Sequence, residues 1–237
     1  MRKLKIPSDL TALAYSSIKQ YILEGQTDPD LRLTEAVLSE QLGISRSPVR
    51  EALNSLATEG LITIEPRRGA FLRRFSVKEM TDLYDLRIVI ETYSVQRAEV
   101  TPKLLATLDK SIERARLLLN KNKKLEYIEE DMNFHGSIAE ATGSAPLVSV
   151  FKNIQSLTWV CRGQTYYLSS NDAVRAHSAI AGALKAGDRE RAKRAMEEHI
   201  SYVRDQLIQF ATKQQAGEHT KSGNGSPGRQ LAGKNGE

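Results

Sequence analysis

The sequence has very little cysteine and no long hydrophobic run. Its 237 residues include one cysteine, Cys161, so an intramolecular disulfide is impossible and zinc held by thiolates is not expected. No stretch approaches the ~20 consecutive apolar residues of a transmembrane helix. The basic start Met1–Lys3 is followed by Ile6–Asp9, where a signal peptide would carry its apolar core. We therefore expect a cytoplasmic protein that is not secreted and has no membrane partner.

Charge is nearly balanced, so bulk charge does not indicate a function. Lys and Arg total 34 against 29 Asp and Glu, and the net charge of +5 is spread thinly. The segment from Ser45 to Arg74 differs, because six arginines accompany only three glutamates there. Such a local basic surface is typical of nucleic-acid binding. With 40% apolar residues, a chain of this length can bury the cores of one or two domains.

The first 75 residues predict three short helices and a β-hairpin. Helical spacing of apolar residues indicates a first helix over 8–23, with an apolar face formed by Leu10, Leu13, Ala14, Ile18 and Ile22. A second helix starts at Thr34 and stops at Gly43, and a third runs from about Ser45 to Gly60. Segments 61–65 and 70–73 then flank a turn at 66–69. This order predicts a winged helix-turn-helix over residues 1–75.

Arginines occupy the positions of this motif that would reach DNA. Arg46 and Arg50 are four residues apart at the start of the third helix, hence on one face, and neither shares the apolar stripe of Val49. The hairpin tip suits the phosphate backbone or the minor groove. An alternative is that Arg50 merely pairs with a nearby glutamate on a solvated face. The candidate DNA-binding residues are Ser45, Arg46, Ser47, Arg50, Arg67, Arg68 and Gly69.

This region resembles the DNA-binding domain of GntR-family transcription regulators. The specific stretch is Leu42–Leu53, supported by Leu33–Gln41, Glu59–Leu61 and Arg68–Phe71. Asp30 and Ser39 depart from the usual glycine and alanine, and neither departure affects the residues expected to face DNA. The resemblance implies sequence-specific binding to double-stranded DNA.

Residues 76–213 predict a second domain, an all-helical antiparallel bundle, so the fold class is mainly α. A capping box at Ser76–Glu79 opens the first of six helices, and no strand-like alternation occurs. Further starts are expected at Thr101, about Lys124, Ser144, Ser170 and Asp188. Residues 214–237 are rich in glycine and poor in large apolar residues, which predicts a disordered tail.

Three of the four histidines and one aspartate are expected on the inner faces of these helices. Asp131 and His135 are four residues apart, so their side chains are neighbours on one helix. His177 and His199 lie at similar distances from the turn at Gly187 and can face one another. A divalent cation, zinc or nickel, would compensate the buried carboxylate. The alternative is an Asp–His hydrogen-bond network without metal.

The second domain resembles the FCD type, the ligand-binding domain of the FadR subgroup, in Asp131–His135, His177, Gly187–Asp188 and His199. This resemblance implies a metal that helps to hold a small organic acid effector, and homodimers that bind palindromic operators. Arg87 lies on an inner helix face, where its anion is either Glu91 or the effector carboxylate. Arg162 is a second candidate for the effector, and Trp159 and Tyr166 are expected to border its cavity.

Three classes of function fit these features. The first is an effector-responsive transcription regulator without catalytic activity, which we expect. The second is a metal-dependent enzyme fused to a DNA-binding domain, with Glu140 as the only candidate base. The third is a constitutive architectural DNA-binding protein, which would need no buried metal ligands.

Overall fold

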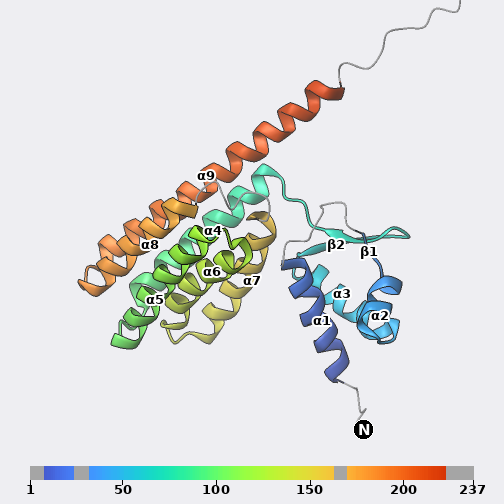
Figure 1. Cartoon of the computed structure of the whole chain (residues 1–237), viewed down its shortest axis with the longest axis horizontal. Helices are drawn as coiled ribbons and strands as arrows, with labels where there is room; N and C mark the ends of the chain where they lie inside the picture. Colours follow the sequence, from blue (N-terminus) through green and yellow to red (C-terminus); the bar gives the residue numbers. More distant parts are fainter. Residues whose placement is uncertain (1–7, 24–31, 163–169, 223–237) are drawn as a thin grey trace, which may run out of the picture.

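The computed structural model describes residues 8–23, 32–162 and 170–222, which form two packed units (Figure 1). In these ranges, the N-terminal unit contains three helices and a small sheet, namely α1 (Ser8–Leu23), β1 (Arg32–Leu33), α2 (Glu35–Leu42), α3 (Arg46–Thr58), β2 (Ile62–Glu65) and β3 (Gly69–Leu72). The strands are antiparallel in the order β1-β3-β2. The predicted helices and hairpin are therefore confirmed. The short β1 was missed, because two residues are too few to show an alternating pattern.

The helix-turn-helix is set by local capping. The Thr34 side chain accepts a hydrogen bond from the Val37 amide and caps α2, as predicted. Gly43 ends α2 in the left-handed conformation, with φ of 65°, which L-residues with a Cβ adopt only at a cost. After this turn Ser45 precedes α3, although its side chain makes no capping hydrogen bond. Ser45, Arg46 and Ser47, which follow this turn, are all exposed.

The core of the N-terminal unit differs in part from the predicted face of α1. Ala14, Ile18 and Ile22 are buried as expected. Leu10 and Leu13, however, are 43% and 57% exposed. Leu13 lies about 140° around the helix from Ile18, and so points away from α3. Leucine at these two positions was wrongly assigned to the core.

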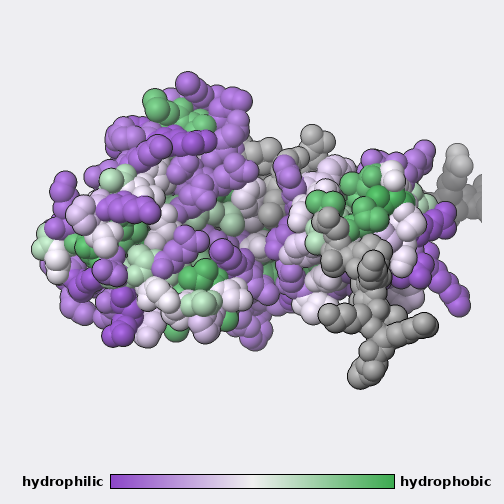
Figure 2. Space-filling view, turned by 90° about the horizontal axis from the view of Figure 1, so that it is seen from below, coloured by the Kyte–Doolittle hydropathy of each residue, from purple (hydrophilic) through white to green (hydrophobic). Residues whose placement is uncertain are grey.

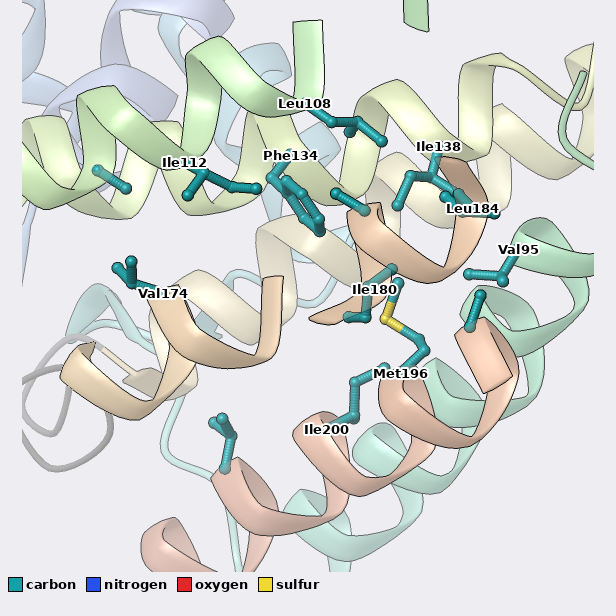
Figure 3. Close-up of a cluster of buried hydrophobic side chains, with 14 of the residues drawn as sticks. Val95, Leu108, Ile112, Phe134, Ile138, Val174, Ile180, Leu184, Met196 and Ile200 are labelled. Carbon is teal, nitrogen blue, oxygen red and sulfur yellow. The ribbon is translucent and has the colours of Figure 1, made fainter. Parts of the chain in front are cut away.

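Within the described residues, the C-terminal unit is the predicted bundle of six helices, α4 (Val77–Arg97), α5 (Pro102–Asn120), α6 (Lys124–Glu140), α7 (Ala145–Arg162), α8 (Ser170–Lys185) and α9 (Arg189–Ser222). The capping box at Ser76 and Glu79 is present, and Thr101 caps α5. Helix α4 packs along α9, α8 lies between α9 and α5, and α6 contacts α5 and α7. Figure 3 shows apolar side chains from α4, α5, α6, α8 and α9 meeting in one core.

Helix α9 continues to Ser222, nine residues beyond the predicted end of the bundle at 213. The expectation of disorder from residue 214 onward is therefore wrong for 214–222. Lys213, Gln214, Gln215 and Ala216 are good helix formers, and they allow a helix already nucleated by the bundle to propagate. Residues 223–237 lie outside the described residues.

The two units touch through α7 and through the segment that joins them. Leu157 and Val160 of α7 pack against the apolar core of the N-terminal unit, and α1 contacts α7. Arg73, just after β3, donates a hydrogen bond of 2.7 Å to Glu79 in the first turn of α4. The underside of the molecule is largely hydrophilic, with small separate apolar patches (Figure 2). None of the described helices is long and apolar enough to cross a membrane.

Candidate metal centre and nucleic-acid interface

Four buried side chains from three helices meet inside the C-terminal bundle. They are Asp131 and His135 of α6, His177 of α8 and His199 of α9, and all are at most 5% exposed. One ligand atom from each lies within 4.8 Å of the others. The sequence prediction that these side chains face one another is confirmed.

The distances between the ligand atoms fit a metal ion. The Nε2 atom of His177 lies 3.1 Å from Nε2 of His135, 3.3 Å from Nε2 of His199 and 3.6 Å from Oδ1 of Asp131. Ligand atoms placed tetrahedrally at 2.0–2.1 Å around zinc would be about 3.3 Å apart. Hydrogen bonds alone satisfy this group less well, because a neutral imidazole has one N–H to donate. The cluster therefore has the spacing and chemistry to hold a divalent cation.

Glu91 of α4 orients one of the histidines. Its Oε2 contacts Nδ1 of His135, and its Oε1 accepts a hydrogen bond from Nε of Arg87. Burial alone would raise the pKa of Glu91, but the charges and hydrogen bonds of Arg87 and His135 outweigh it and lower this pKa to about 2. A carboxylate at Nδ1 leaves Nε2 of His135 directed at the cluster, as in carboxylate–histidine–metal arrangements.

The role of Glu91 toward His135 was missed by sequence reasoning, which considered it only as the partner of Arg87. The available signal was a glutamate on the inner face of its helix, one turn after a buried arginine. Its contact with His135 depends on the packing of α4 against α6. That packing cannot be predicted from the spacing within one helix.

The remaining imidazoles are held in a form that suits metal binding. Burial, and then the neighbouring His177 and His135, lower the pKa of His199 well below its ordinary value of 6.5. His199 therefore stays neutral and keeps a lone pair for a metal. Phe134 is fully buried and stacks on the His177 ring, with centroids 4.0 Å apart and planes 6° apart. This stacking fixes the orientation of the His177 ring.

Arg87 lies beside the cluster, but it is already paired. Its side chain is 5% exposed and bonded to Glu91, as one of the two sequence interpretations expected. It lines a small cavity of about 10 Å³ together with Asp131, Met132, Gln155, Thr158, Trp159 and Ile128. That volume holds about one water molecule. The side chain of Arg162 and all of Tyr166 lie outside the described residues, so their predicted positions at the cavity cannot be compared with the structure.

A larger groove lies next to the small cavity, and a few side chains line both of them. It measures about 810 Å³ between α5, α6 and α7, and it shares Met132, Gln155 and Trp159 with the small cavity. The Gln155 side chain donates a hydrogen bond of 2.8 Å to the Met132 carbonyl and so joins α7 to α6. Met132, Gln155 and Trp159 thus separate the outer groove from the cluster.

The arginines of the N-terminal unit are exposed where the motif predicts contact with DNA. Arg46 and Arg50 lie in the first two turns of α3, and both are exposed. Arg50 donates hydrogen bonds of 2.8 Å from Nε and Nη2 to the two carboxylate oxygens of Glu35. This bond lowers the pKa of Glu35 against the opposing effect of burial, and the charges of Arg50 and Arg46 lower it further. The predicted alternative of an Arg50–glutamate pair is therefore present in the structure.

The wing carries its basic residues at the tip of the hairpin. Arg67 adopts a φ of 64°, and the exposed Arg68 pairs with Glu65. Gly69 follows with a φ of 109°, and a Cβ there would lie 3.2 Å from the Leu33 carbonyl oxygen. Glycine is therefore required where β3 approaches β1. The turn leaves the arginine side chains outside the sheet.

An exposed recognition helix, a basic wing and a buried ligand cluster define a transcription regulator with a separate helical domain. The comparisons agree, because residues 10–72 match the model "Bacterial regulatory proteins, gntR family" and residues 82–202 match the FCD domain. The chain belongs to the GntR family and carries an FCD C-terminal domain, as in the FadR subgroup.

Similar proteins are known from several bacteria. The HTH-type regulator YdhC of Bacillus subtilis is 26% identical over 84% of this chain and 92% of its own length. The gluconate operon transcriptional repressor of Bacillus licheniformis is 26% identical over 84% of this chain and 85% of its own length. McbR/YncC of Escherichia coli has the same fold, with a TM-score of 0.76 at 22% identity over 85% of this chain and 98% of that one. YdhC and the gluconate operon repressor are transcription regulators rather than enzymes, so the enzymatic alternative is set aside.

Proposed function

We propose that the protein is a transcription repressor whose affinity for a palindromic operator is set by a small organic acid bound beside a divalent metal. The proposal takes residues 1–75 as the DNA-binding domain and 76–213 as the effector domain, and it requires a homodimer. The observation that carries it is the four-ligand cluster beside Arg87 and a small cavity. The repressor activity is proposed because a relative of similar length is a gluconate operon repressor.

The metal ligands in this proposal are Asp131, His135, His177 and His199. A bound cation would supply a fixed positive charge to which a carboxylate can bind. The Arg87 guanidinium, held at the cavity by Glu91, would add a second point of attraction for the acid. Zinc and nickel both suit three imidazoles and one carboxylate.

The effector must enlarge the cavity, because about 10 Å³ does not accommodate an organic acid. Enlargement requires Gln155 and Trp159 to move away from α6. Both residues belong to α7, whose Leu157 and Val160 pack against the DNA-binding unit. Effector binding would therefore shift α7 and with it the position of the recognition helix.

On the DNA side, we assign base contacts to Arg46 and Arg50, with Ser45 and Ser47 beside them at the start of α3. We assign backbone contacts to Arg67, Arg68 and Gly69 at the wing. Arg50 must leave Glu35 to reach a base or a phosphate. This exchange costs little, because the pair is exposed to solvent.

A binding assay on selected DNA tests the proposal. Duplexes bound by the purified protein would be selected from a random pool, and their affinity measured by fluorescence anisotropy with and without metal and candidate sugar acids, hydroxy acids and dicarboxylates. We expect one acid to change operator affinity by roughly 5- to 150-fold, the usual range of such coupling. Operator affinity that is unaffected by every acid and by chelation would instead indicate a constitutive architectural protein.

The experiment needs variants that separate metal from effector. His177→Ala should remove the metal and the response, whereas His219→Ala changes the one histidine outside the cluster and serves as the control. Gln155→Ala removes the bond that joins α7 to α6, and it should let the acid bind more tightly without changing metal content. An acid that binds wild type and His177→Ala equally well would contradict the proposed site.

A further inference from the structure

One face of α4 is apolar and exposed over three successive turns. Leu86, Val89 and Tyr93 are 47%, 63% and 51% exposed, and their spacing of three and four residues places them on one side of the helix. Single exposed apolar residues are ordinary on protein surfaces, but a continuous stripe marks an interaction site. The other large exposed apolar side chains among the described residues do not form such a run along one helix. We call Leu86, Val89 and Tyr93 the α4 stripe.

Opposite charges flank the α4 stripe on the same face. Asp82 lies one turn before Leu86, Arg97 lies one turn after Tyr93, and both are exposed. Asp82 is bonded to Lys78 at 2.5 Å, an exposed pair that opens at little cost. Along this face of α4, the order is therefore one acidic residue, three apolar residues and one basic residue.

This pattern is complementary to its own reverse. If a second α4 is laid antiparallel about a two-fold axis between Val89 and Ile90, Leu86 lies opposite Tyr93 and Asp82 lies opposite Arg97. Each contact then occurs twice, which is the requirement of a two-fold symmetric interface. A parallel arrangement would instead place like charges together.

We propose that the α4 stripe is the homodimer interface and that its occupant is the antiparallel α4 of a second copy. This inference rests on the proposed function in one respect, namely that the regulator binds DNA as a homodimer. The inference adds that the two copies pair through this face of α4, that the two helices run antiparallel, and that Leu86 of one copy lies opposite Tyr93 of the other.

The arrangement also agrees with the spacing of DNA half-sites. Each DNA-binding unit joins the bundle directly before Val77, at the start of α4. In the antiparallel register the two Val77 residues lie about 38 Å apart along the paired helices, at 1.5 Å per residue. Half-sites in one groove repeat at about 34–36 Å along B-DNA. The interface thus places the starts of the two α4 helices, where the DNA-binding units are attached, at about the separation of the two half-sites of a palindromic operator.

Sedimentation velocity without DNA tests the interface. Wild type should have twice the chain mass of 26.4 kDa at micromolar concentration. Val89→Asp should raise the dimer dissociation constant roughly tenfold or more, because two carboxylates then meet at the axis. Leu117→Asp, at a residue of α5 that is 56% exposed, is the matched control and should leave the dimer unchanged. Circular dichroism spectra like that of wild type, with a cooperative thermal transition, would show that the variants fold, because loss of the dimer alone lowers the melting temperature.

A charge exchange tests the register. Asp82→Arg and Arg97→Asp should each weaken the dimer, and the double variant should restore it, because opposite charges again face each other. Reversal of the exposed Glu113–Arg116 pair on α5 is the control and should have no effect. Failure of the double variant to recover would overturn the antiparallel register.

Disulfide trapping supplies an independent result. In a Cys161→Ser background, Val89→Cys should cross-link to its own copy on mild oxidation, whereas Leu117→Cys should not. A dimer that survives Val89→Asp and does not cross-link would overturn this face while leaving the homodimer of the proposed function intact. A wild type that stays monomeric at every concentration would overturn both the face and the homodimer, and operator binding by anisotropy would then be measured separately.

Discussion

The two units of the molecule contain similar arginine–glutamate pairs in opposite environments. Arg50 and Glu35 bond through two hydrogen bonds of 2.8 Å, with side chains 63% and 33% exposed. Arg87 and Glu91 also bond, but their side chains are only 5% and 2% exposed. Solvent screens the first pair, so it can open when another anion competes. The second cannot open without leaving a charge uncompensated in the protein interior.

The burial of an arginine–glutamate pair, rather than its residue types, determines whether the pair can open to bind a partner or holds its side chains in place. The exposed pair keeps an arginine available for a partner that is not yet bound. The buried pair holds a carboxylate in place against His135 and so fixes a candidate metal ligand. Matched substitutions in the two pairs can test this difference directly.

Removal of the buried carboxylate should have the largest effect. Glu91→Ala leaves Arg87 buried without its partner and His135 without its orienting group. We expect a loss of about 3–5 kcal/mol in the free energy of unfolding, the usual cost of breaking a buried pair. Urea denaturation measures this loss. Glu35→Ala, the matched change in the exposed pair, should leave the midpoint nearly unchanged, and equal losses in the two variants would refute the proposed role of burial.

Metal removal should have the next largest effect. The purified protein should contain about one zinc or nickel ion per chain, bound by the four-residue cluster. At a free metal concentration of 100 to 1,000 times the dissociation constant, binding to the folded state alone adds about 2.7–4.1 kcal/mol of stability. Chelation should therefore lower the melting temperature, and elemental analysis should show the loss. Glu91→Gln, which keeps the shape but not the charge, should weaken metal binding about 10- to 100-fold.

A metal-free wild type whose melting temperature does not respond to added zinc or nickel would contradict the site. The cluster would then be an Asp–His network, the alternative left open by the sequence. His219→Ala controls for nonspecific loss of a histidine.

Much of the fold and half of the site follow from spacing within single helices. The Asp131–His135 spacing and the turn between His177 and His199 predicted two pairs of neighbouring ligands, because helical periodicity determines which side chains share a face, and the resemblance to the FCD type implied that the two pairs form one site. The contact of Glu91 with His135 and the bond of Gln155 to Met132 were not predicted. Each joins two helices, and single-helix periodicity contains no information about how helices pack.

The same limit explains the errors at the surface. Leu10 and Leu13 have the hydrophobicity of core residues, but whether a leucine is covered depends on which side of its helix the neighbouring helix packs against. The predicted end of the bundle at 213 was placed where apolar residues stop. Helix α9 nevertheless continues to Ser222, because a helix that is already formed can extend without burying apolar residues, as the good helix formers from Lys213 to Ala216 allow.

Loss of the exposed arginine should change DNA binding without changing stability. Arg50→Ala should cost about 1–3 kcal/mol of operator affinity for each base that the arginine reads, and it should relax sequence preference. Arg67→Ala at the wing should instead weaken binding evenly on operator and random duplexes. Fluorescence anisotropy on both duplexes compares the two variants. Undiminished sequence preference in Arg50→Ala would show that Glu35 is its actual partner.

The smallest effect should be the dependence of stability on pH, and it should come from the buried cluster. Burial and the neighbouring imidazoles depress the pKa of His199 in the folded state below 6.5, so only the unfolded chain takes up this proton as the pH falls. Stability is therefore fully present above pH 6.5 and falls below it, by at most about 1.4 kcal/mol per pH unit for one group.

Glu91 should continue this trend at lower pH. Its pKa is lowered to about 2 because Arg87 and His135 outweigh the effect of burial, so its contribution is present above pH 4.5 and is lost toward pH 2. Urea denaturation of the chelated protein at pH 8, 6.5, 5.5, 4.5 and 3.5 measures the slope, with His199 acting down to pH 4.5 and Glu91 below it. His199→Gln should flatten the curve between pH 6.5 and 4.5, whereas Glu35→Ala should leave it nearly unchanged, because the exposed pair is screened by solvent. A wild-type curve that is flat through this range, or one flattened equally by both variants, would show that burial does not distinguish the two units in the way proposed.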